Sequence, residues 1–265
     1  MVEFARSSPP RRRRLRDRRT PGGVVGSNPG RVWSAVGSGP VNQAGVAGER
    51  STYDVRGNET ERAYFDEAGK PTRSSDGYVG WRSTYDVRGN ETERAYFDEA
   101  GKPLRNNDGV AGERFTYDAR GNVTERAYFD EAGKPVRDKA GVAGERCAYD
   151  ARGHQTERAY FDEAGKPARS NEGYAVSRST YDARGNEIER AYFDEAGKPT
   201  RNRDGIAIWR SAFDVFGNET EGTYFDETGK PRSNRTGGRG YRTTFNARGN
   251  LIDVIPLDEA GKPMR

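Results

Sequence analysis

The sequence predicts an all-β protein, an elongated array of tandem β-hairpins with a 32-residue period and a disordered N-terminal tail. Three observations predict it. The period recurs without a phase slip, each period contains Asp-x-x-Gly turn signatures, and the segments between the turns are rich in aromatic residues and threonine. Repeats of this kind stack, so that each unit buries apolar side chains against its neighbours. At 32% hydrophobic and 32% charged residues, the chain has too few aliphatic side chains for one ordinary globular core.

The repeat region is expected to cover residues 42–265. A partial copy occupies residues 42–52, because its stretch GVAGERST nearly repeats GVAGERFT at residues 109–116. A truncated seventh unit occupies residues 245–265. Between them lie six complete units that together span residues 53–244 and start at Tyr53, Tyr85, Tyr117, Tyr149, Tyr181 and Phe213.

Each unit contains two related turn signatures. The first is aromatic-Asp-x-Arg-Gly-Asn, as at residues 53–58, and the second is Phe-Asp-Glu-Ala-Gly-Lys-Pro, as at residues 65–71. In both, Asp favours the first position of a type I turn and Gly favours the fourth, where a positive φ costs it little. Such a turn followed by a left-handed glycine gives a common hairpin loop with a bulge. A third turn is marked by Asp108-Gly109.

The segments that flank the first turn are expected to be strands. Residues 82–85 precede the turn and residues 92–97 follow it, and both are rich in the aromatic and threonine side chains that suit strands. The alternative is a short helix over the segment TERAYFDEA, which would give an αβ repeat. We favour the strand, because nine or ten residues without a broad apolar stripe make a marginal helix.

Two parts of the array vary between copies. The segment after Gly-Lys-Pro differs in almost every unit, so we expect it to be exposed. The last unit departs furthest from the common pattern, as terminal repeats do when they cap a stack. Its aliphatic residues suit a cap or a docking edge: Leu251, Ile252, Val254, Ile255 and Leu257.

Residues 1–41 form a separate, Arg-rich segment, which we expect to be disordered. They carry nine arginines against Glu3 and Asp17, whereas the remaining residues carry 36 basic and 39 acidic groups. Only this tail therefore has the charge to attract nucleic acid or an anionic membrane. No aromatic residues interleave with the arginines in a recognisable fold, so we favour an unstructured tail over a binding segment.

Membrane and export signals are not evident. No run approaches the ~18 apolar residues of a membrane span, and the N-terminal arginines are not followed by the apolar stretch of a signal peptide. A single cysteine, Cys147, excludes an intramolecular disulfide. We expect a cytoplasmic location.

Two rows of aromatic residues recur with the period. The phenylalanines Phe65, Phe97, Phe129, Phe161, Phe193 and Phe225 alternate along their strands with tyrosines and should face the opposite side of a sheet. We favour a structure in which both rows pack. If only one packs, the other could bind a glycan, a peptide or a cell-wall polymer by stacking. The candidate binding stripe consists of Tyr64, Tyr96, Tyr128, Tyr160, Tyr192 and Tyr224.

No catalytic, metal-binding or cofactor-binding constellation stands out. His154 replaces an asparagine of the first turn, and Cys147 replaces a serine. We therefore interpret both as substitutions at structural positions of the repeat. A nucleophile needs a basic partner and an orienting group, and the sequence suggests neither near Cys147. The repeated carboxylates such as Asp66 and Glu67 lie in turns and lack the spacing of a calcium loop. We expect no enzyme activity and no cofactor.

An arginine recurs three positions before the aromatic residue that starts each unit. We expect it to pair with a glutamate of the neighbouring strand, such as Glu61 or Glu93. Each cross-strand pair contributes only ~0.2–1 kcal/mol, but the row helps to fix the register between identical units. Its members are Arg50, Arg82, Arg114, Arg146, Arg178, Arg210 and Arg242.

The Tyr-Asp-x-x-Gly-Asn motifs resemble the YD repeats of bacterial Rhs-type proteins. The alternation with Asp-x-x-Gly-Lys-Pro and a following Asp-Gly is also similar to WG-type β-hairpin repeats. The resemblance covers residues 45–265, although the intervals between motifs here alternate between 12 and 20 residues. It implies an extended β-hairpin array of bacterial type that serves as a surface or scaffold. No toxin or protease segment accompanies the repeats, so the shell-like encapsulation of that family is not implied.

These observations lead to two functional expectations. The first is a non-enzymatic repeat scaffold that presents an extended surface to a protein or a polymer, where several weak and equivalent contacts add up. The second is a carbohydrate-binding or cell-wall-binding array that uses exposed tyrosines. Architecture is the basis of both expectations.

Overall fold

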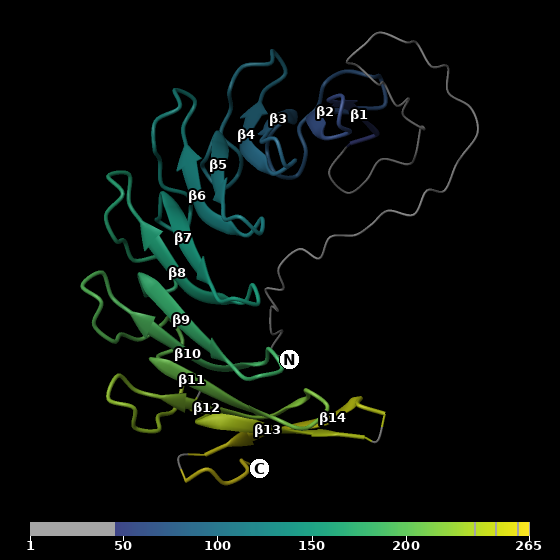
Figure 1. Ribbon diagram of the computed structural model, residues 1–265. Coiled ribbons are helices and arrows are strands. Elements are labelled where there is room, and N and C mark those ends of the chain that lie inside the picture. The colour runs from purple at the N-terminus through teal and green to yellow at the C-terminus, as the bar shows by residue number, and fades with distance from the viewer. Residues whose placement is uncertain (1–45, 236, 247, 259, 265) are drawn as a thin grey trace.

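The computed structural model describes residues 46–264 except 236, 247 and 259, so the predicted tail at residues 1–41 lies outside the described residues. The described chain forms one antiparallel sheet of 14 strands, β1 to β14, whose order in the sheet is their order in the sequence (Figure 1). It contains no helix. The prediction of an all-β hairpin array is confirmed. The helical alternative for TERAYFDEA is wrong, since its first six residues form a strand in the repeat units and its last three begin a turn.

Each unit contributes one strand of six residues and one of seven. The shorter strands are β1 (Gly48–Tyr53), β3 (Gly80–Tyr85), β5 (Gly112–Tyr117), β7 (Gly144–Tyr149), β9 (Val176–Tyr181), β11 (Ile208–Phe213) and β13 (Gly240–Phe245). The longer strands are β2 (Glu59–Phe65), β4 (Glu91–Phe97), β6 (Val123–Phe129), β8 (Gln155–Phe161), β10 (Glu187–Phe193), β12 (Glu219–Phe225) and β14 (Leu251–Leu257).

The first turn joins a short strand to the long strand that follows it, as the Asp-x-x-Gly signature predicts. In the first hairpin, the amide of Gly57 donates to the carbonyl of Asp54 at 3.0 Å, and Gly57 has a φ of 85°. The register then shifts between Thr52 and Tyr53, which is a β-bulge. The same turn and shift recur in each hairpin, so every unit has the same bend where its strands leave the turn.

A longer connection joins each long strand to the next unit, and it contains the second and third turns. Pro71 returns to form an isolated bridge with Phe65, and the chain then passes through a third turn at residues 74–77. Only three residue pairs link the two strands across this junction, Glu61 with Arg82, Arg62 with Trp81, and Ala63 with Gly80. Units are therefore joined by a shorter ladder of backbone contacts than the hairpins inside them.

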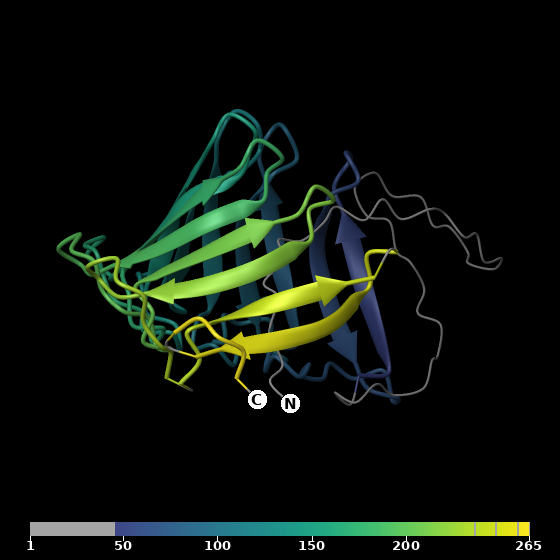
Figure 2. The same ribbon diagram turned by 90° about the horizontal axis from the view of Figure 1, so that it is seen from below.

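The sheet curves into an arc (Figure 1), and the view from below shows the same curvature along the order of the strands (Figure 2). Its apolar core is thin and lies where the connections fold over the strand ends. The buried cluster consists of Tyr78, Trp81, Tyr96 and Val110, with Tyr64, Leu104, Tyr128 and Val136 packed against it. Because the cluster draws on consecutive units, burial in this fold depends on neighbours, as expected for a repeat array.

Candidate interaction surface

One face of the sheet carries the phenylalanine row, and each ring is covered by an arginine. The guanidinium carbon of Arg114 lies 4.4 Å from the centre of the Phe129 ring, and Arg146 covers Phe161 at the same distance. Six such pairs run from Arg50 over Phe65 to Arg210 over Phe225. A cation over an aromatic ring contributes ~0.5–1 kcal/mol at exposed sites. The arrangement also occupies the ring face that a ligand would need for stacking.

The same arginines bridge neighbouring units. Nε of Arg114 lies 2.8 Å from Oε2 of Glu93, and the corresponding pairs in the other junctions span 2.6–2.9 Å. The prediction that these arginines pair with glutamates of the adjacent strand is confirmed for Arg82 to Arg242. Arg50, on β1, has no carboxylate within ion-pair distance among the described residues.

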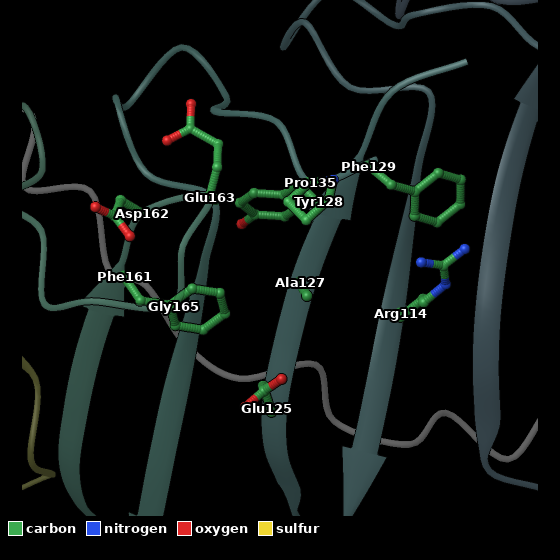
Figure 3. Close-up of a pocket in the computed structure, with 11 residues that line it drawn as sticks. Arg114, Glu125, Ala127, Tyr128, Phe129, Pro135, Phe161, Asp162, Glu163 and Gly165 are labelled. Carbon is green, nitrogen blue, oxygen red and sulfur yellow. The ribbon is translucent and has the colours of Figure 1, made fainter. Parts of the chain in front are cut away.

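A pocket of about 200 Å³ opens between two adjacent units on the phenylalanine side. Figure 3 shows the rings of Phe129 on β6 and Phe161 on β8, with Arg114 beside the first of them. Glu125 and Glu163 bring carboxylates to the same pocket, where Glu125 is engaged by Arg146 at 2.7 Å. The pocket therefore combines apolar walls with charges that are already paired.

The other face carries the tyrosine row, and it is not an exposed stripe. Tyr96, Tyr192 and Tyr224 are buried, and Tyr64, Tyr128 and Tyr160 are half-buried. This burial agrees with the favoured expectation that both aromatic rows pack, and none of the six tyrosines is exposed. Burial raises the pKa of the Tyr224 hydroxyl to about 12, in keeping with a ring withdrawn from water. A binding role for this row stays a prediction.

The connection between units is what covers the tyrosines. Tyr78 stacks on Tyr96 with ring centres 4.5 Å apart and lies 6.2 Å from Tyr64. In a later unit, Tyr174 occupies the same place between Tyr160 and Tyr192, at 5.8 Å and 4.6 Å. Strand alternation places the two aromatic rows on opposite faces, and the path of the connection is what buries the tyrosine row.

Next to the tyrosines, a polar network links the two strands of a hairpin. Ser51 Oγ donates to Glu59 Oε1 at 2.5 Å, and Nε of Arg62 lies 2.8 Å from the same oxygen. Where the serine is replaced, the glutamate is replaced with it: Phe115 and Val123 take the two positions in one unit, and Cys147 accepts from Gln155 in the next. The two positions change together along the sequence, and this signal was available but missed.

The third turns form a row of neighbouring loop tips at one margin of the array. The amide of Asn107 donates to the carbonyl of Asp76 at 2.8 Å, and four further units repeat this bond at 2.7–2.9 Å. We call these residues the loop-tip row, and all except Ala140 are exposed. They are Ser75, Asp76, Asn107, Asp108, Lys139, Ala140, Asn171, Glu172, Arg203 and Asp204. The expectation that the segment after Gly-Lys-Pro is exposed is confirmed for them. It is wrong for the end of that segment, where Tyr78, Val79 and Trp81 are buried because the connection folds back onto the sheet.

At the opposite margin the first turns are also joined. Arg56 Nη1 donates to the carbonyl of Val87 at 2.9 Å, and arginines 88, 120, 152 and 184 reach the next turn in the same way. The hydroxyl of Tyr85 donates to the carbonyl of Glu59 at 2.6 Å, a bond repeated by Tyr117, Tyr149 and Tyr181. The first residue of the YD motif thus fastens a unit to its predecessor, a role the motif alone did not reveal.

The turn aspartates are held in their ionised form. Oδ1 of Asp118 accepts from the amides of Arg120 and Asn122 at 2.8 and 2.9 Å, and Oδ2 accepts from the Asn122 side chain at 2.8 Å. These bonds lower the pKa of Asp118, and the equivalent aspartates shift in the same direction for the same reason. In the fourth unit, the hydrogen bond from His154 holds the pKa of Asp150 at about 2.

His154 and Cys147 have structural partners. His154 Nδ1 lies 2.8 Å from Asp150 Oδ2, and the ring stacks on Tyr181 at 4.8 Å. Burial raises the pKa of the Cys147 thiol. Within the described residues, no three His, Cys, Asp or Glu side chains gather in a group that could hold a metal ion. No helix there is able to cross a membrane.

Comparison with known proteins assigns no family to this chain. No family model and no curated protein matches the sequence. Solved structures that match include the Photorhabdus luminescens Tc holotoxin pore, at 13% identity and a TM-score of 0.44, covering 78% of this chain and 11% of that one. TcdB2-TccC3-TEV matches at 13% identity and TM-score 0.38, covering 82% and 12%, and TcdB2-TccC3-Cdc42 at 14% and 0.34, covering 82% and 13%. The chain therefore spans little more than a tenth of the chains it matches, and its hairpin array is established by its own strands.

Proposed function

We propose that this chain is a non-enzymatic repeat scaffold that binds a protein partner along the loop-tip row. One observation carries the proposal: adjacent loop tips are fastened to one another, yet their exposed side chains differ from unit to unit. At one equivalent position, five successive units carry Asp76, Asp108, Ala140, Glu172 and Asp204. A constant frame with variable exposed side chains is the arrangement that a specific, extended contact requires.

The frame of the row is stiffened by ion pairs as well as by backbone bonds. Nε of Arg105 lies 2.9 Å from Oε2 of Glu131 in the next unit, and the equivalent pairs in four other units span 2.7–3.0 Å. Each exposed pair is worth little, ~0–1 kcal/mol. Together they hold the connections in one register, so that the binding positions are ordered before the partner arrives and less entropy is lost on association.

A protein partner is favoured over a polysaccharide because the aromatic rings are already covered. Sugars stack on open ring faces, but the phenylalanines lie under arginines and the tyrosines lie under the connections. The loop-tip row offers carboxylates, amides, Lys139 and Arg203. These groups suit the polar and charged rim of a protein interface.

Site-specific photo-crosslinking tests this assignment. We would place p-benzoylphenylalanine at Asp108 or Glu172 in the loop-tip row and, as matched controls, at Val55 or Val87 in the first turns, all exposed positions. The proposal expects one protein species to be captured from both loop-tip positions and from neither control. Capture only from the first turns, or competition by soluble cell-wall polysaccharide, would contradict it.

The affinity of the captured partner then tests multivalency. Deleting residues 117–148 removes one whole unit and keeps the phase of the array. A scaffold with additive contacts should lose affinity stepwise as units are removed, about tenfold for each ~1.4 kcal/mol of lost contact. An affinity that one point substitution abolishes and unit number leaves unchanged would instead indicate a single local site.

A further inference from the structure

The two outer edges of the sheet carry complementary halves of the junction that joins one unit to the next. We propose that the chain self-associates head to tail, with β14 of one copy pairing with β1 of another. The proposal does not depend on the scaffold function. It rests on the residues of the two edges, compared with the six internal junctions in which both halves are present.

An internal junction has a fixed pattern. A glutamate of the long strand lies opposite an arginine of the next short strand, as with Glu221 and Arg242, which are 2.9 Å apart. Two positions later the long strand faces the residue that opens the short strand, as Thr223 faces Gly240. A Cβ on Gly240 would lie 2.2 Å from the carbonyl oxygen of Gly222, so this glycine allows the strands to come close, whereas Val176 and Ile208 occupy the position in two other junctions.

The outer edge of β1 has the short-strand half of this pattern. Arg50 is stacked on Phe65 at 4.4 Å, the same posture as Arg82 on Phe97, but no carboxylate in the described chain pairs with it. Gly48 stands at the close-approach position, and no described strand pairs with this edge. An acidic residue on an incoming long strand would complete the junction.

The outer edge of β14 has the long-strand half. Asp253 occupies the place of Glu221, and it has no basic partner among the described residues. On either side of it, the ion pair that Glu59 and Arg62 form in the first unit is replaced by Leu251 and Val254. These two side chains are 55% and 44% exposed. Asp253 is therefore the acid of this edge, and Val254 lies on the opposite face of the strand.

If β14 and β1 of two copies pair in the register of the internal junctions, Asp253 lies opposite Arg50 of the neighbouring copy. Val254 then lies opposite Glu49, and Ile255 lies opposite Gly48. A contact between two different surfaces is heterologous, so it propagates into open chains or closes into rings instead of stopping at a symmetric dimer. The opposite charges of Asp253 and Arg50 favour this pairing over the pairing of two identical edges.

The contact is weaker than an internal junction. Pro256 occupies the place of Tyr224, whose amide donates to the carbonyl of Arg239 at 2.9 Å, and a proline has no amide hydrogen to donate. The amide of Val254 is also engaged by the Asp253 carboxylate at 2.8 Å, and this contact must open on pairing. Association should therefore be weak and depend on concentration, because a proline on an edge strand reduces its pairing with another strand.

Sedimentation velocity of the full chain over a concentration series tests the proposal. We expect the wild type to form dimers and higher species as concentration rises, and we expect Arg50→Glu or Asp253→Arg alone to weaken association about tenfold, because each change opposes two like charges. An equal mixture of the two variants should restore association, since every junction between unlike copies again pairs an acid with a base.

Three results would overturn the proposal: a wild-type chain that remains monomeric throughout, association unchanged by both variants, or association that stops at a dimer and responds only to Asp253→Arg. The last would show that two β14 edges pair with one another. Circular dichroism of each variant checks that the array is folded, and the mixing experiment controls for loss of structure, because an unfolded variant cannot be rescued by its counterpart.

Discussion

The junctions in the middle of the array and those at its C-terminal end have the same backbone but not the same contacts. Between the units that start at Tyr149 and Tyr181, the side-chain contacts include Arg178 with Glu157, Arg169 with Glu195, Tyr181 with the carbonyl of Gln155, and Arg152 with the next turn. The last junction keeps the strand ion pair of Arg242. Its tyrosine, turn arginine and connection arginine are replaced by Phe245, Phe216 and Ser233. Thr243 takes over the bond to the carbonyl of Glu219, and the hydroxyl of Tyr241 donates to the Glu219 carboxylate at 2.7 Å, so the two arginine contacts are the ones without a replacement.

The difference shows how a near-identical repeat array can be unevenly stable. In a linear array each unit is stabilised mainly by its two neighbours, so contacts missing from one junction weaken that junction and not the whole molecule. The C-terminal units, which have fewer of these contacts, also expose apolar side chains: Phe216 is 87% exposed and Ile252 is 65% exposed. The C-terminal unit is therefore the part expected to open first, and also the part with the most surface to offer a partner.

The largest expected effect is acid destabilisation of the middle units. The folded pKa of each turn aspartate from Asp54 to Asp214 lies below its ordinary value. A lowered folded pKa contributes stability above the unfolded pKa of ~3.9, and this contribution is lost as pH falls through the folded value, about 2 for Asp150. The last unit has Asn246 at this position and does not titrate there. Thermal melts between pH 2 and 7 should show the difference in stability between the two regions shrinking in acid, and a constant difference would contradict this account.

Removing one turn carboxylate should come next in size. Asp118→Ala leaves two backbone amides and the Asn122 side chain without their charged acceptor, so we expect a lower free energy of unfolding. The matched control is Asn246→Ala in the last unit, where a neutral side chain accepts two amides at 2.9 and 3.0 Å. Urea unfolding should show a smaller loss for the control. Equal losses would mean that the charge of the aspartate is immaterial.

The tyrosine hydroxyls test the contacts between units directly. Tyr149→Phe removes the bond to the carbonyl of Val123 and should cost ~0.5–1.5 kcal/mol. The reverse change, Phe213→Tyr, places a hydroxyl at the position from which Tyr181 reaches Gln155 and should stabilise the C-terminal units by a similar amount. Chemical denaturation of both variants measures this. A destabilised Phe213→Tyr would show that the last units follow a different geometry.

Much of the fold follows from local sequence rules. The turns at Asp54 and Asp66 and the pairing of Arg82 with Glu61 are fixed by residues close in sequence or by strand alternation, so they could be predicted. The burial of Tyr96 under Tyr78 could not, because it depends on where the connection travels after Pro71. The paired change of Phe115 and Val123 could have been read from the sequence, since both replace polar residues within one unit.

The smallest expected effect comes from restoring the missing turn arginine. Phe216→Arg rebuilds the side chain that in the preceding unit, as Arg184, donates to the carbonyl of Val215. We expect a gain of ~0.2–1 kcal/mol at this exposed site. The loss of an 87% exposed phenylalanine should also reduce binding of a hydrophobic dye. Differential scanning calorimetry and dye fluorescence would record the two changes, and a lower melting temperature would argue against a contact between neighbouring turns.

Hydrogen exchange followed by mass spectrometry tests the central claim most directly. The account predicts that amides in β13 and β14 exchange at least about tenfold faster than those in β7 to β10, because local opening follows the contacts that hold each unit. It also predicts that exchange slows progressively from the C-terminal end toward the middle of the array. Uniform protection along the sheet, or fastest exchange in the middle units, would contradict the view that the contacts between units set their stability.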